Sequence, residues 1–336
     1  MGGVECAVCP PNDISWDRRN GALGSERGNH ASALAMEMPD PARSPSIGMK
    51  LRAYYELTKP GVTLMVALST VAGYALALPE GIFSVFTEGH GGRFLATLMG
   101  TLLTSGGSGA LNHYAEWSSD QLMLRTRQRP IPAGVLTPYQ GLLWGLVLCF
   151  LGLGVLLFVD FLVLLLATLT VVSYIVVYTP MKRQTPMALY VGAIPGAAPA
   201  AGGWIAASGL GWGAVLVFLV LYFWQLPHFL ALSWLYRKDY AQAGFPMTAV
   251  LDQSGKRVAW QILLTSLILL GVTFAVGHVV QASLGFMGGI GLLGIWVLWE
   301  AFSFLRQLSF TSARRVLRSS YAYLLGFVAF AIGARL

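Results

Sequence analysis

Residues 258–279 read VAWQILLTSLILLGVTFAVGHV, a run that contains no aspartate, glutamate, lysine or arginine. A helix of about 20 apolar residues crosses the hydrocarbon core of a bilayer. This run therefore predicts a transmembrane helix. The rest of the chain has the same character, since 55% of its 336 residues are hydrophobic, 11% are charged and the mean hydropathy is +0.63.

Comparable apolar runs recur along the chain, and by length they predict about nine membrane spans. They cover residues 61–79, 93–114, 137–157, 160–178, 187–207, 212–236, 258–279, 284–304 and 317–334. We therefore expect an all-α, polytopic membrane protein. Asp160 sits between the third and fourth runs, and the fifth run is broken by Pro195 and Pro199. Interrupted backbone at membrane depth needs a protein-lined or wet cavity, although close helix packing also selects the small residues found there.

The basic residues support this segmentation, because short cytoplasmic loops are enriched in lysine and arginine. With the N-terminus inside, only Arg93 and Arg335 fall on the outer side. The net charge of +7 is then a topology signal and an attraction to anionic lipid, and no nucleic-acid partner is expected. The inner side receives Lys50, Arg52, Lys59, Arg125, Arg127, Arg129, Lys182, Arg183, Arg237, Lys238, Lys256, Arg257, Arg306, Arg314, Arg315 and Arg318.

The first 48 residues differ from the rest, because they mix arginines with many acids and contain no apolar run. We expect a disordered tail over residues 1–48, followed by one membrane domain over residues 49–336. The tail is too acidic for a mitochondrial transit peptide and lacks the apolar core of a signal peptide. A bacterial cell inner membrane with a cytoplasmic N-terminus is the expected location. Cys6 and Cys9 form a lone C-x-x-C without a second pair, which we interpret as incidental.

The segment NHYAEWSSD, residues 112–120, follows the second apolar run. Steps of four residues place Asn112, Glu116 and Asp120 on one face of a helix. Oxygen ligands of this kind suit Mg²⁺, which binds one or two carboxylates and bridges to substrate phosphates. Arg125 and Arg129 come next in the chain and could bind the remaining negative charge. The alternative is a polar loop that only caps helices.

Further polar residues follow the fourth and sixth runs on the same side. Asp239 follows the sixth run as Glu116 and Asp120 follow the second, which suggests two halves of one site. Ionisable groups at membrane depth usually serve substrate or ion handling. Tyr178, Lys182 and Arg183 close the fourth run and could bind an anion, or they could form an ordinary positive-inside loop with an interfacial tyrosine.

The sixth run contains the segment WQLPHF, residues 224–229, with an amide and an imidazole beside a helix-breaking proline. His228 could face a cavity or be a satisfied buried histidine. The chain lacks paired His/Cys metal spacing, a Walker-type Gly-Lys loop and a nucleophile elbow. These absences argue against a zinc enzyme, an ATPase and a serine hydrolase.

Several of these motifs occur in the same order in a known family. The chain resembles UbiA-type intramembrane prenyltransferases, and within them the subfamily of protoheme IX farnesyltransferases, or heme O synthases. The resemblance covers residues 57 to about 250. It rests on Leu57-Thr58-Lys59-Pro60, Asn112-x-x-x-Glu116-x-x-x-Asp120, Met123-Leu124-Arg125-Thr126-Arg127-Gln128-Arg129-Pro130, Tyr178-Thr179, Lys182-Arg183-Gln184-Thr185-Pro186, Trp224-Gln225-Leu226-Pro227-His228-Phe229 and Asp239-Tyr240-Ala241-Gln242-Ala243-Gly244-Phe245-Pro246-Met247.

The resemblance implies transfer of a farnesyl group from farnesyl diphosphate to a vinyl group of heme B, giving heme O and diphosphate for heme A biosynthesis. It also implies a Mg²⁺ cofactor, a central cavity open toward the cytoplasm, surrounding membrane lipid and a downstream heme A synthase as a further partner. On these motifs the expected catalytic residues are Asn112, Glu116, Asp120 and Asp239, of which the first three bind the metal. The expected diphosphate-binding residues are Arg125, Arg129, Tyr178, Lys182 and Arg183, and His228, Trp224 and Tyr240 are expected at the heme or cavity.

Two residues depart from the family pattern. Glu116 stands where many bacterial members have aspartate, and Lys238 stands where many have a second acid before Asp239. The second change weakens the case for a second metal site. Two alternative functions remain: a related prenyltransferase acting on an aromatic or quinone precursor, and a heme carrier or assembly protein without catalytic activity.

Overall fold

The computed structural model describes residues 45–87 and 89–334. The described residues belong to one compact unit, Pro45–Leu336. The expected tail up to residue 44, with Cys6 and Cys9, lies outside the described residues, and so does Arg335. The first helix begins at Ile47, next to the expected domain start at residue 49.

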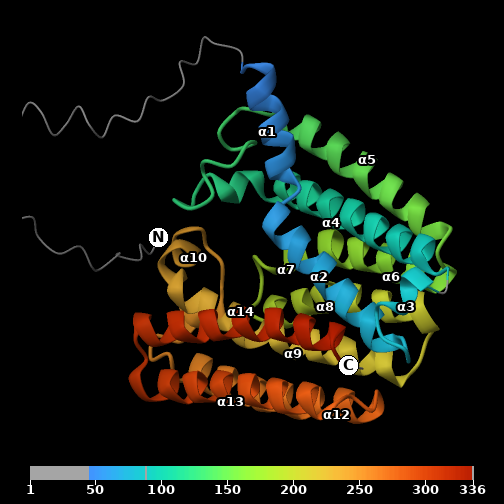
Figure 1. Cartoon of the computed structure of the whole chain (residues 1–336). Coiled ribbons are helices and arrows are strands. Elements are labelled where there is room, and N and C mark those ends of the chain that lie inside the picture. Colours follow the sequence, from blue (N-terminus) through green and yellow to red (C-terminus); the bar gives the residue numbers. More distant parts are fainter. Residues whose placement is uncertain (1–44, 88, 335–336) are drawn as a thin grey trace, which may run out of the picture. The chain divides into compact units, whose positions relative to one another are not determined.

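All regular secondary structure among the described residues is helical, in agreement with the predicted fold class (Figure 1). The elements are α1 (Ile47–Leu57), α2 (Pro60–Ala77), α3 (Ser84–Thr87), α4 (Gly91–Asp120), α5 (Pro138–Leu157), α6 (Phe161–Val172), η1 (Ser173–Tyr178), α7 (Thr179–Met181), α8 (Ala188–Ser208), α9 (Trp212–Leu235), α10 (Arg237–Gln242), α11 (Thr248–Leu251), α12 (Lys256–Val279), α13 (Leu284–Gln307) and α14 (Phe310–Ile332).

Eight helical segments in the described part of the chain are long and apolar enough to cross a membrane. One of them joins α6, η1 and α7 into a single segment, Phe161–Met181. The ninth long helix is α8, at the position of the fifth predicted run, and it is rich in glycine, proline and alanine. The predicted set of apolar spans thus has a helix at each position, and this confirms a multi-pass membrane protein.

The expectation that proline interrupts the fifth run is wrong. Pro195 and Pro199 lie inside the continuous helix α8, and Pro227 likewise lies inside α9. Proline removes one backbone donor and one hydrogen bond, but neighbouring helices compensate for that loss in the interior of a membrane protein. The small residues of α8 serve close packing instead of a break in the helix.

That close packing joins α8 to α2, and two glycines make it possible. A Cβ at Gly73 would lie 1.9 Å from the carbonyl oxygen of Ala200, and one at Gly203 would lie 2.1 Å from that of Thr70. Both distances are far inside van der Waals contact, so any side chain would force the helices apart. Small residues that let backbones approach are the usual means of helix association in membranes.

The segment η1 between α6 and α7 is a π-helix. A π-helical turn contains one more residue than an α-helical turn, so it changes the direction in which every later side chain points. Thr179 is the first residue after η1, and its hydroxyl accepts a hydrogen bond from the Asn112 amide on α4 at 3.3 Å. The start of α6 is fixed by Asp160, whose carboxylate accepts the backbone N–H of Leu162 at 2.8 Å. The charge between the third and fourth runs is therefore an N-cap.

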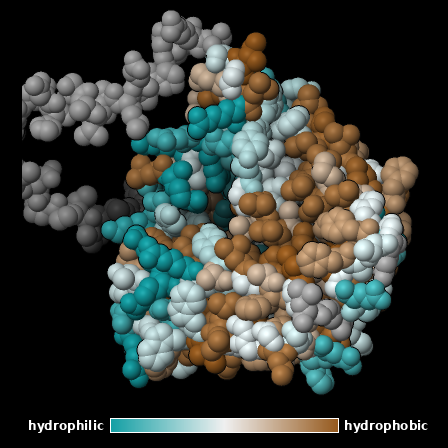
Figure 2. Space-filling view, in the orientation of Figure 1, coloured by the Kyte–Doolittle hydropathy of each residue, from teal (hydrophilic) through white to brown (hydrophobic). Residues whose placement is uncertain are grey.

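Polar and apolar surfaces separate along the bundle. Figure 2 shows hydrophilic residues gathered at the end that carries α10 and the loop after α4, while apolar residues cover much of the remaining visible face. α4 and α5 run side by side toward that end (Figure 1). The last turns of α4 therefore bring the NHYAEWSSD segment to the polar end of a membrane-embedded bundle.

Candidate active site

The three predicted oxygen donors lie on one face of α4 and are buried. Asn112, Glu116 and Asp120 are 2%, 5% and 0% exposed, respectively. Burying a carboxylate is costly unless a cation or several donors compensate for the lost water. The predicted helical spacing is thus present, and the burial requires partners for each group.

Glu116 and Asp120 each have a cationic partner from a segment after α4. The ammonium of Lys182 lies 3.2 Å from Glu116 Oε1, and the guanidinium of Arg129 lies 2.7 Å from Asp120 Oδ2. Burial opposes the charge on Lys182, but the adjacent Glu116 carboxylate raises the pKa of Lys182 well above its ordinary value. Lys182 is therefore a fixed positive charge.

Asn112 completes the row and is held from both sides. Lys59 donates from Nζ to Asn112 Oδ1 at 2.5 Å, and Asn112 donates to Thr179. Lys59 adopts a left-handed backbone conformation, with φ of 49°, at the junction of α1 and α2. Burial, followed by the nearby positive charge of Arg129, lowers the pKa of Lys59 to about 7. Lys59 was not among the predicted site residues, although its place before Pro60 in a family motif was an available signal.

One carboxylate oxygen in this row has no hydrogen-bond partner. Asp120 Oδ1 is fully enclosed and unpaired among the described residues. A buried anionic oxygen of this kind is an available ligand for a hard cation. No group of three or more His, Cys, Asp or Glu side chains with metal-binding geometry occurs in the described ranges. The donor set of one amide and two carboxylates, already beside cations, suits an ion that takes most of its ligands from substrate and water.

The segment after α9 meets the segment after α4, as the two-halves prediction required. Tyr240 is 9% exposed and packs in one apolar cluster with Met123, Phe245 and Met247. The Lys182 ammonium also lies 5.1 Å from the centre of the Phe245 ring. Asp239 precedes Tyr240 in α10 and is partly exposed. The second acid therefore lies on a segment that packs against the first acidic segment.

The predicted diphosphate-binding residues separate into an inner and an outer group. Arg129 and Lys182 contact the acids of α4, whereas Arg125 and Arg183 are exposed. The Arg125 guanidinium lies 5.1 Å from the centre of the Tyr236 ring, and Arg183 donates hydrogen bonds to the hydroxyls of Ser118 and Ser119. The Tyr178 ring stacks on Tyr174 with 5.4 Å between ring centres.

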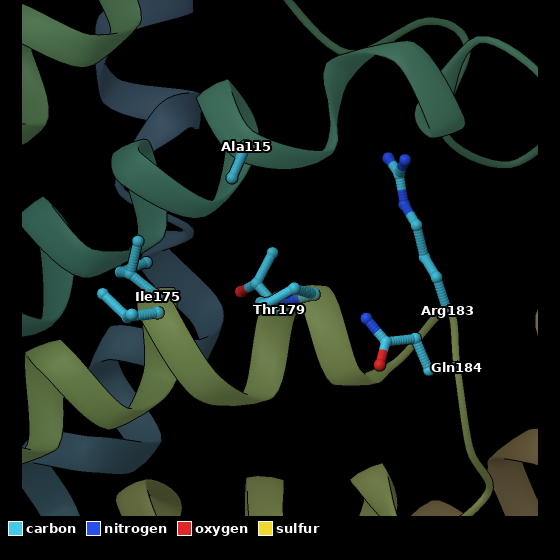
Figure 3. Close-up of a pocket in the computed structure, with 7 residues that line it drawn as sticks. Ala115, Ile175, Thr179, Arg183 and Gln184 are labelled. Atoms are coloured by element: carbon cyan, nitrogen blue, oxygen red, sulfur yellow. The ribbon is translucent and has the colours of Figure 1, made fainter.

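A pocket of about 460 Å³ lies between α4 and the η1–α7 segment (Figure 3). Figure 3 shows the Arg183 side chain extending toward the loop that follows α4, with Thr179 between Ala115 and Gln184. Thr179 belongs to the lining of this pocket and also accepts the hydrogen bond from Asn112, whereas Asn112, Glu116 and Asp120 do not line the pocket. The lining residues are Ala115, Ile175, Val176, Thr179, Pro180, Arg183 and Gln184.

The other expected heme or cavity residues form a separate polar contact between α9 and α14. Trp224 donates from its indole to the backbone carbonyl of Ser320 at 2.6 Å. His228 Nδ1 lies 2.9 Å from the Ser320 hydroxyl. Both side chains are buried, and these two contacts join segment 224–229 of α9 to the last transmembrane helix, α14.

Comparison with known proteins places this geometry in a family. A sequence profile described as the UbiA prenyltransferase family matches residues 66–333. The chain belongs to the UbiA prenyltransferase family. A UbiA-family relative from Salinibacter ruber, named "Protoheme IX farnesyltransferase", is 40% identical to the chain over 82% of this chain and 96% of the relative.

Solved structures of UbiA-type proteins share the fold. A digeranylgeranylglyceryl phosphate synthase superposes with a TM-score of 0.68 at 15% identity, covering 84% of this chain and 99% of the other. A UbiA homologue from Archaeoglobus fulgidus bound to DMAPP and Mg²⁺ superposes with a TM-score of 0.62 at 16% identity, covering 84% and 98%. At these identities the likeness establishes the family architecture alone.

Proposed function

We propose that this protein transfers the farnesyl group of farnesyl diphosphate to a vinyl group of protoheme IX, forming heme O and releasing diphosphate. The observation that carries the proposal is the buried row of Asn112, Glu116 and Asp120, each beside a cation. This row occurs in a chain that is 40% identical to a relative named for that reaction. A buried set of fixed charges suits a reaction in which a highly anionic leaving group forms.

Asp120, together with Glu116 and Asn112, would hold Mg²⁺. The unpaired Oδ1 of Asp120 supports this assignment, because it is an enclosed oxygen without a donor. Bound Mg²⁺ would neutralise charge on the diphosphate oxygens as the allylic carbon–oxygen bond breaks. The Mg²⁺ seen with DMAPP in the Archaeoglobus fulgidus homologue agrees with this role.

The cations of this chain would bind the remaining phosphate charge. Lys182 and Arg129 already lie at the acids, and Lys59 lies at Asn112, so a diphosphate would meet three positive groups there. Arg125 and Arg183 are exposed and would make contacts at the edge of the site. Arginine binds phosphate oxygens in bidentate fashion, whereas lysine acts as a compact point charge.

The reaction then requires that the farnesyl cation be shielded from water until the vinyl group of the heme attacks it. The bonding pair of the allylic carbon–oxygen bond leaves with diphosphate, and the vinyl π-electrons form the new carbon–carbon bond. Water adds to the remaining vinyl carbon and loses a proton. The stacked rings of Tyr174 and Tyr178, close to Lys182 and Glu116, offer aromatic faces to the cation. Exclusion of water before carbon–carbon bond formation prevents simple hydrolysis.

The proposed setting is a bacterial cell inner membrane with the N-terminus in the cytoplasm. The basic residues of the loops support this orientation, because it places nearly all of them on the cytoplasmic side. The diphosphate-binding cluster then faces the cytoplasm and the isoprenoid chain extends into the lipid or an apolar groove. Each buried CH₂ contributes about 0.8 kcal/mol, so membrane burial supplies much of the isoprenoid's binding.

The test is a product assay with the purified protein, farnesyl diphosphate, heme B and Mg²⁺, analysed by mass spectrometry. We expect a heme whose mass increases by one farnesyl group and one hydroxyl group, and no product when EDTA removes the metal. A parallel reaction with an aromatic acid acceptor tests the alternative substrate class. Heme binding without any product, unchanged in Asp120→Asn, would instead identify a heme carrier and refute the proposal.

A further inference from the structure

The hydrogen bonds around His228 determine which ring nitrogen carries its proton. His228 Nδ1 lies 2.9 Å from the Ser320 hydroxyl, and that hydroxyl donates to the backbone carbonyl of Leu317 at 2.7 Å. A serine hydroxyl has a single proton to donate. Toward His228 it therefore accepts, and Nδ1 is the donor. The neutral ring then has its lone pair on Nε2.

The lone pair on Nε2 is free and reachable. No described residue forms a hydrogen bond with Nε2, and this atom is absent from the enclosed unpaired polar atoms, among them His113 Nδ1 and Asp120 Oδ1. Although His228 as a whole is 6% exposed, Nε2 thus retains accessible surface. A nitrogen lone pair held in this way is an unused ligand.

Aromatic rings border this position. Phe229 and Tyr321 lie with their ring centres 5.3 Å and 4.7 Å from that of His228, both nearly perpendicular to it. Phe229 and Tyr321 are 39% and 44% exposed, respectively. Part of each side chain is therefore not covered by the described residues. A flat, apolar ligand can lie against such faces. The combination of a nitrogen ligand and open aromatic rings suits a metalloporphyrin.

We propose that Nε2 of His228 binds the iron of the heme substrate and positions the porphyrin for farnesyl transfer. This inference rests on the proposed function. Metal-binding histidines nearly always donate their other N–H to a second group, which fixes the tautomer and the ring orientation. Ser320 supplies that group here. Histidine is a common axial ligand of heme iron.

The position of His228 along α9 agrees with this role. It lies seven residues before Leu235, the last residue of α9, and therefore about 10 Å from that end of the helix. The chain continues from that end into α10, which packs against the segment after α4. A porphyrin bound at His228 would place its apolar ring against the rings of Phe229 and Tyr321. The charged diphosphate would remain at the polar end.

Ser320 is a positioning residue in this arrangement. Its backbone carbonyl is fixed by the Trp224 indole at 2.6 Å, independently of its hydroxyl. Ser320→Ala therefore removes the partner of Nδ1 but leaves the contact between Trp224 and the backbone of α14. Loss of a hydrogen-bond partner behind a metal ligand typically weakens metal binding by about tenfold or more.

The experiment measures binding of heme B and of iron-free protoporphyrin IX to the purified full chain, together with the spectrum of the bound ferric heme. We expect the wild type to prefer heme B and to show an absorption and electron paramagnetic resonance signature of histidine ligation. His228→Ala should lose that signature and lower the preference for iron at least tenfold, with affinity for the iron-free porphyrin unchanged. Added imidazole should restore the signature. His278→Ala, at an exposed position near the end of α12, is the matched control and should behave as wild type.

The inference is overturned by an unchanged ligation signature in folded His228→Ala, or by a wild type that binds both porphyrins equally. Should His228→Ala fail to fold, Ser320→Ala decides, since an unaltered preference for iron in that variant also overturns the inference. Failure of the proposed function gives a different result. The wild type would then retain a heme signature that depends on His228 but form no farnesylated heme.

Discussion

The guanidinium of Arg129 contacts only one oxygen of the Asp120 carboxylate, with Nη1 2.7 Å from Oδ2. The other oxygen, Oδ1, is enclosed and has no partner among the described residues. Arg129 thus stabilises the charge of Asp120 while leaving half of the carboxylate available. Because buried polar atoms are nearly always paired, the unpaired oxygen is the strongest local sign of a missing ligand in this site.

Asp120→Asn should therefore abolish most turnover while the fold is retained. The amide keeps the size of the side chain but loses the charge that would hold the metal and orient Arg129. We expect turnover to fall by about 100-fold or more, a typical loss when one group that stabilises developing charge is removed. Product formation under saturating Mg²⁺ is the measurement.

The matched control for this variant is Asp160→Asn. Asp160 caps α6 and pairs with Arg93 at 3.5 Å, far along the chain from the acidic face. Asparagine is as good an N-cap as aspartate, so both stability and turnover should stay near wild type. Equal losses of turnover in Asp120→Asn and Asp160→Asn would contradict the assignment of Asp120.

Glu116→Gln should lower stability as well as turnover. The substitution leaves the ammonium of Lys182, whose side chain is 14% exposed, without its carboxylate. Removing one partner of a buried pair typically costs about 3 kcal/mol or more. The double variant Glu116→Gln with Lys182→Met should recover much of that stability but no turnover, because its site lacks both charges.

Glu300→Gln provides the comparison for the buried pair. Its partner Arg315 lies 3.0 Å away, but the Arg315 side chain is 40% exposed. Exposed ion pairs contribute about 0–1 kcal/mol. Resistance to thermal unfolding in detergent should therefore fall clearly in Glu116→Gln and little in Glu300→Gln, and the reverse order would show that the Glu116–Lys182 pair is not stabilising.

Adjacent glycines in α8 should respond oppositely to alanine. The Cβ of Gly203→Ala would meet the backbone oxygen of Thr70 at 2.1 Å, whereas that of Gly202→Ala would have its nearest neighbour, Leu166, at 3.8 Å. Overpacking costs about 1–3 kcal/mol, while alanine in place of glycine favours a helix by roughly 0.5–1 kcal/mol. Thermal unfolding should show Gly203→Ala destabilised and Gly202→Ala unchanged or stabilised. Similar behaviour of the two variants would contradict the close approach of α2 and α8.

Asp252 should stabilise the start of α12 in a manner that depends on pH. Its carboxylate accepts hydrogen bonds from the Ser254 hydroxyl and the Arg257 backbone N–H, both at 2.7 Å. Desolvation raises the pKa of Asp252, but these hydrogen bonds together outweigh it and lower the pKa below its ordinary value of 3.8. The lowered pKa means that the stabilisation is present above 3.8 and is lost as the pH falls through the lower value.

Asp252→Ala should consequently cost about 1 kcal/mol at neutral pH, the usual effect of losing a side-chain acceptor for a backbone N–H in the first turn of a helix. The difference from wild type should shrink in acid, where the wild-type carboxylate becomes protonated. Unfolding temperatures measured from neutral pH down to below pH 3.8 check this prediction. A difference that stays constant across that range would mean that charge on Asp252 does not contribute.

The sequence allowed prediction of the helices and of the acidic face because both depend on local spacing. The four-residue steps from Asn112 to Asp120 are fulfilled within the single helix α4. Apolar length likewise predicted the spans, since bilayer thickness alone sets it. The predicted break at Pro195 was wrong because the effect of a proline on a helix depends on the neighbouring helices. Pro195 lies within an unbroken α8.

The contacts between distant segments could not be predicted in the same way. Lys59 reaches Asn112 only because the junction of α1 and α2 adopts a left-handed conformation, for which a lysine gives no signal. The Ser320 partner of His228 lies 92 residues away and has no distinguishing motif. Such pairings follow from helix packing, which a single sequence does not encode in any local pattern.

The π-helical turn of η1 sets the direction in which the side chains after it point. If residues 173–178 wound as an ordinary α-helix with no change of sequence, the same number of residues would complete more rotation about the helix axis. Every side chain beyond it would then rotate by about 100° around the helix axis. Thr179 and Lys182 would turn away from Asn112 and Glu116 together. A change of helix type between Ser173 and Tyr178 would thus separate the two halves of the site as completely as removing its lysine.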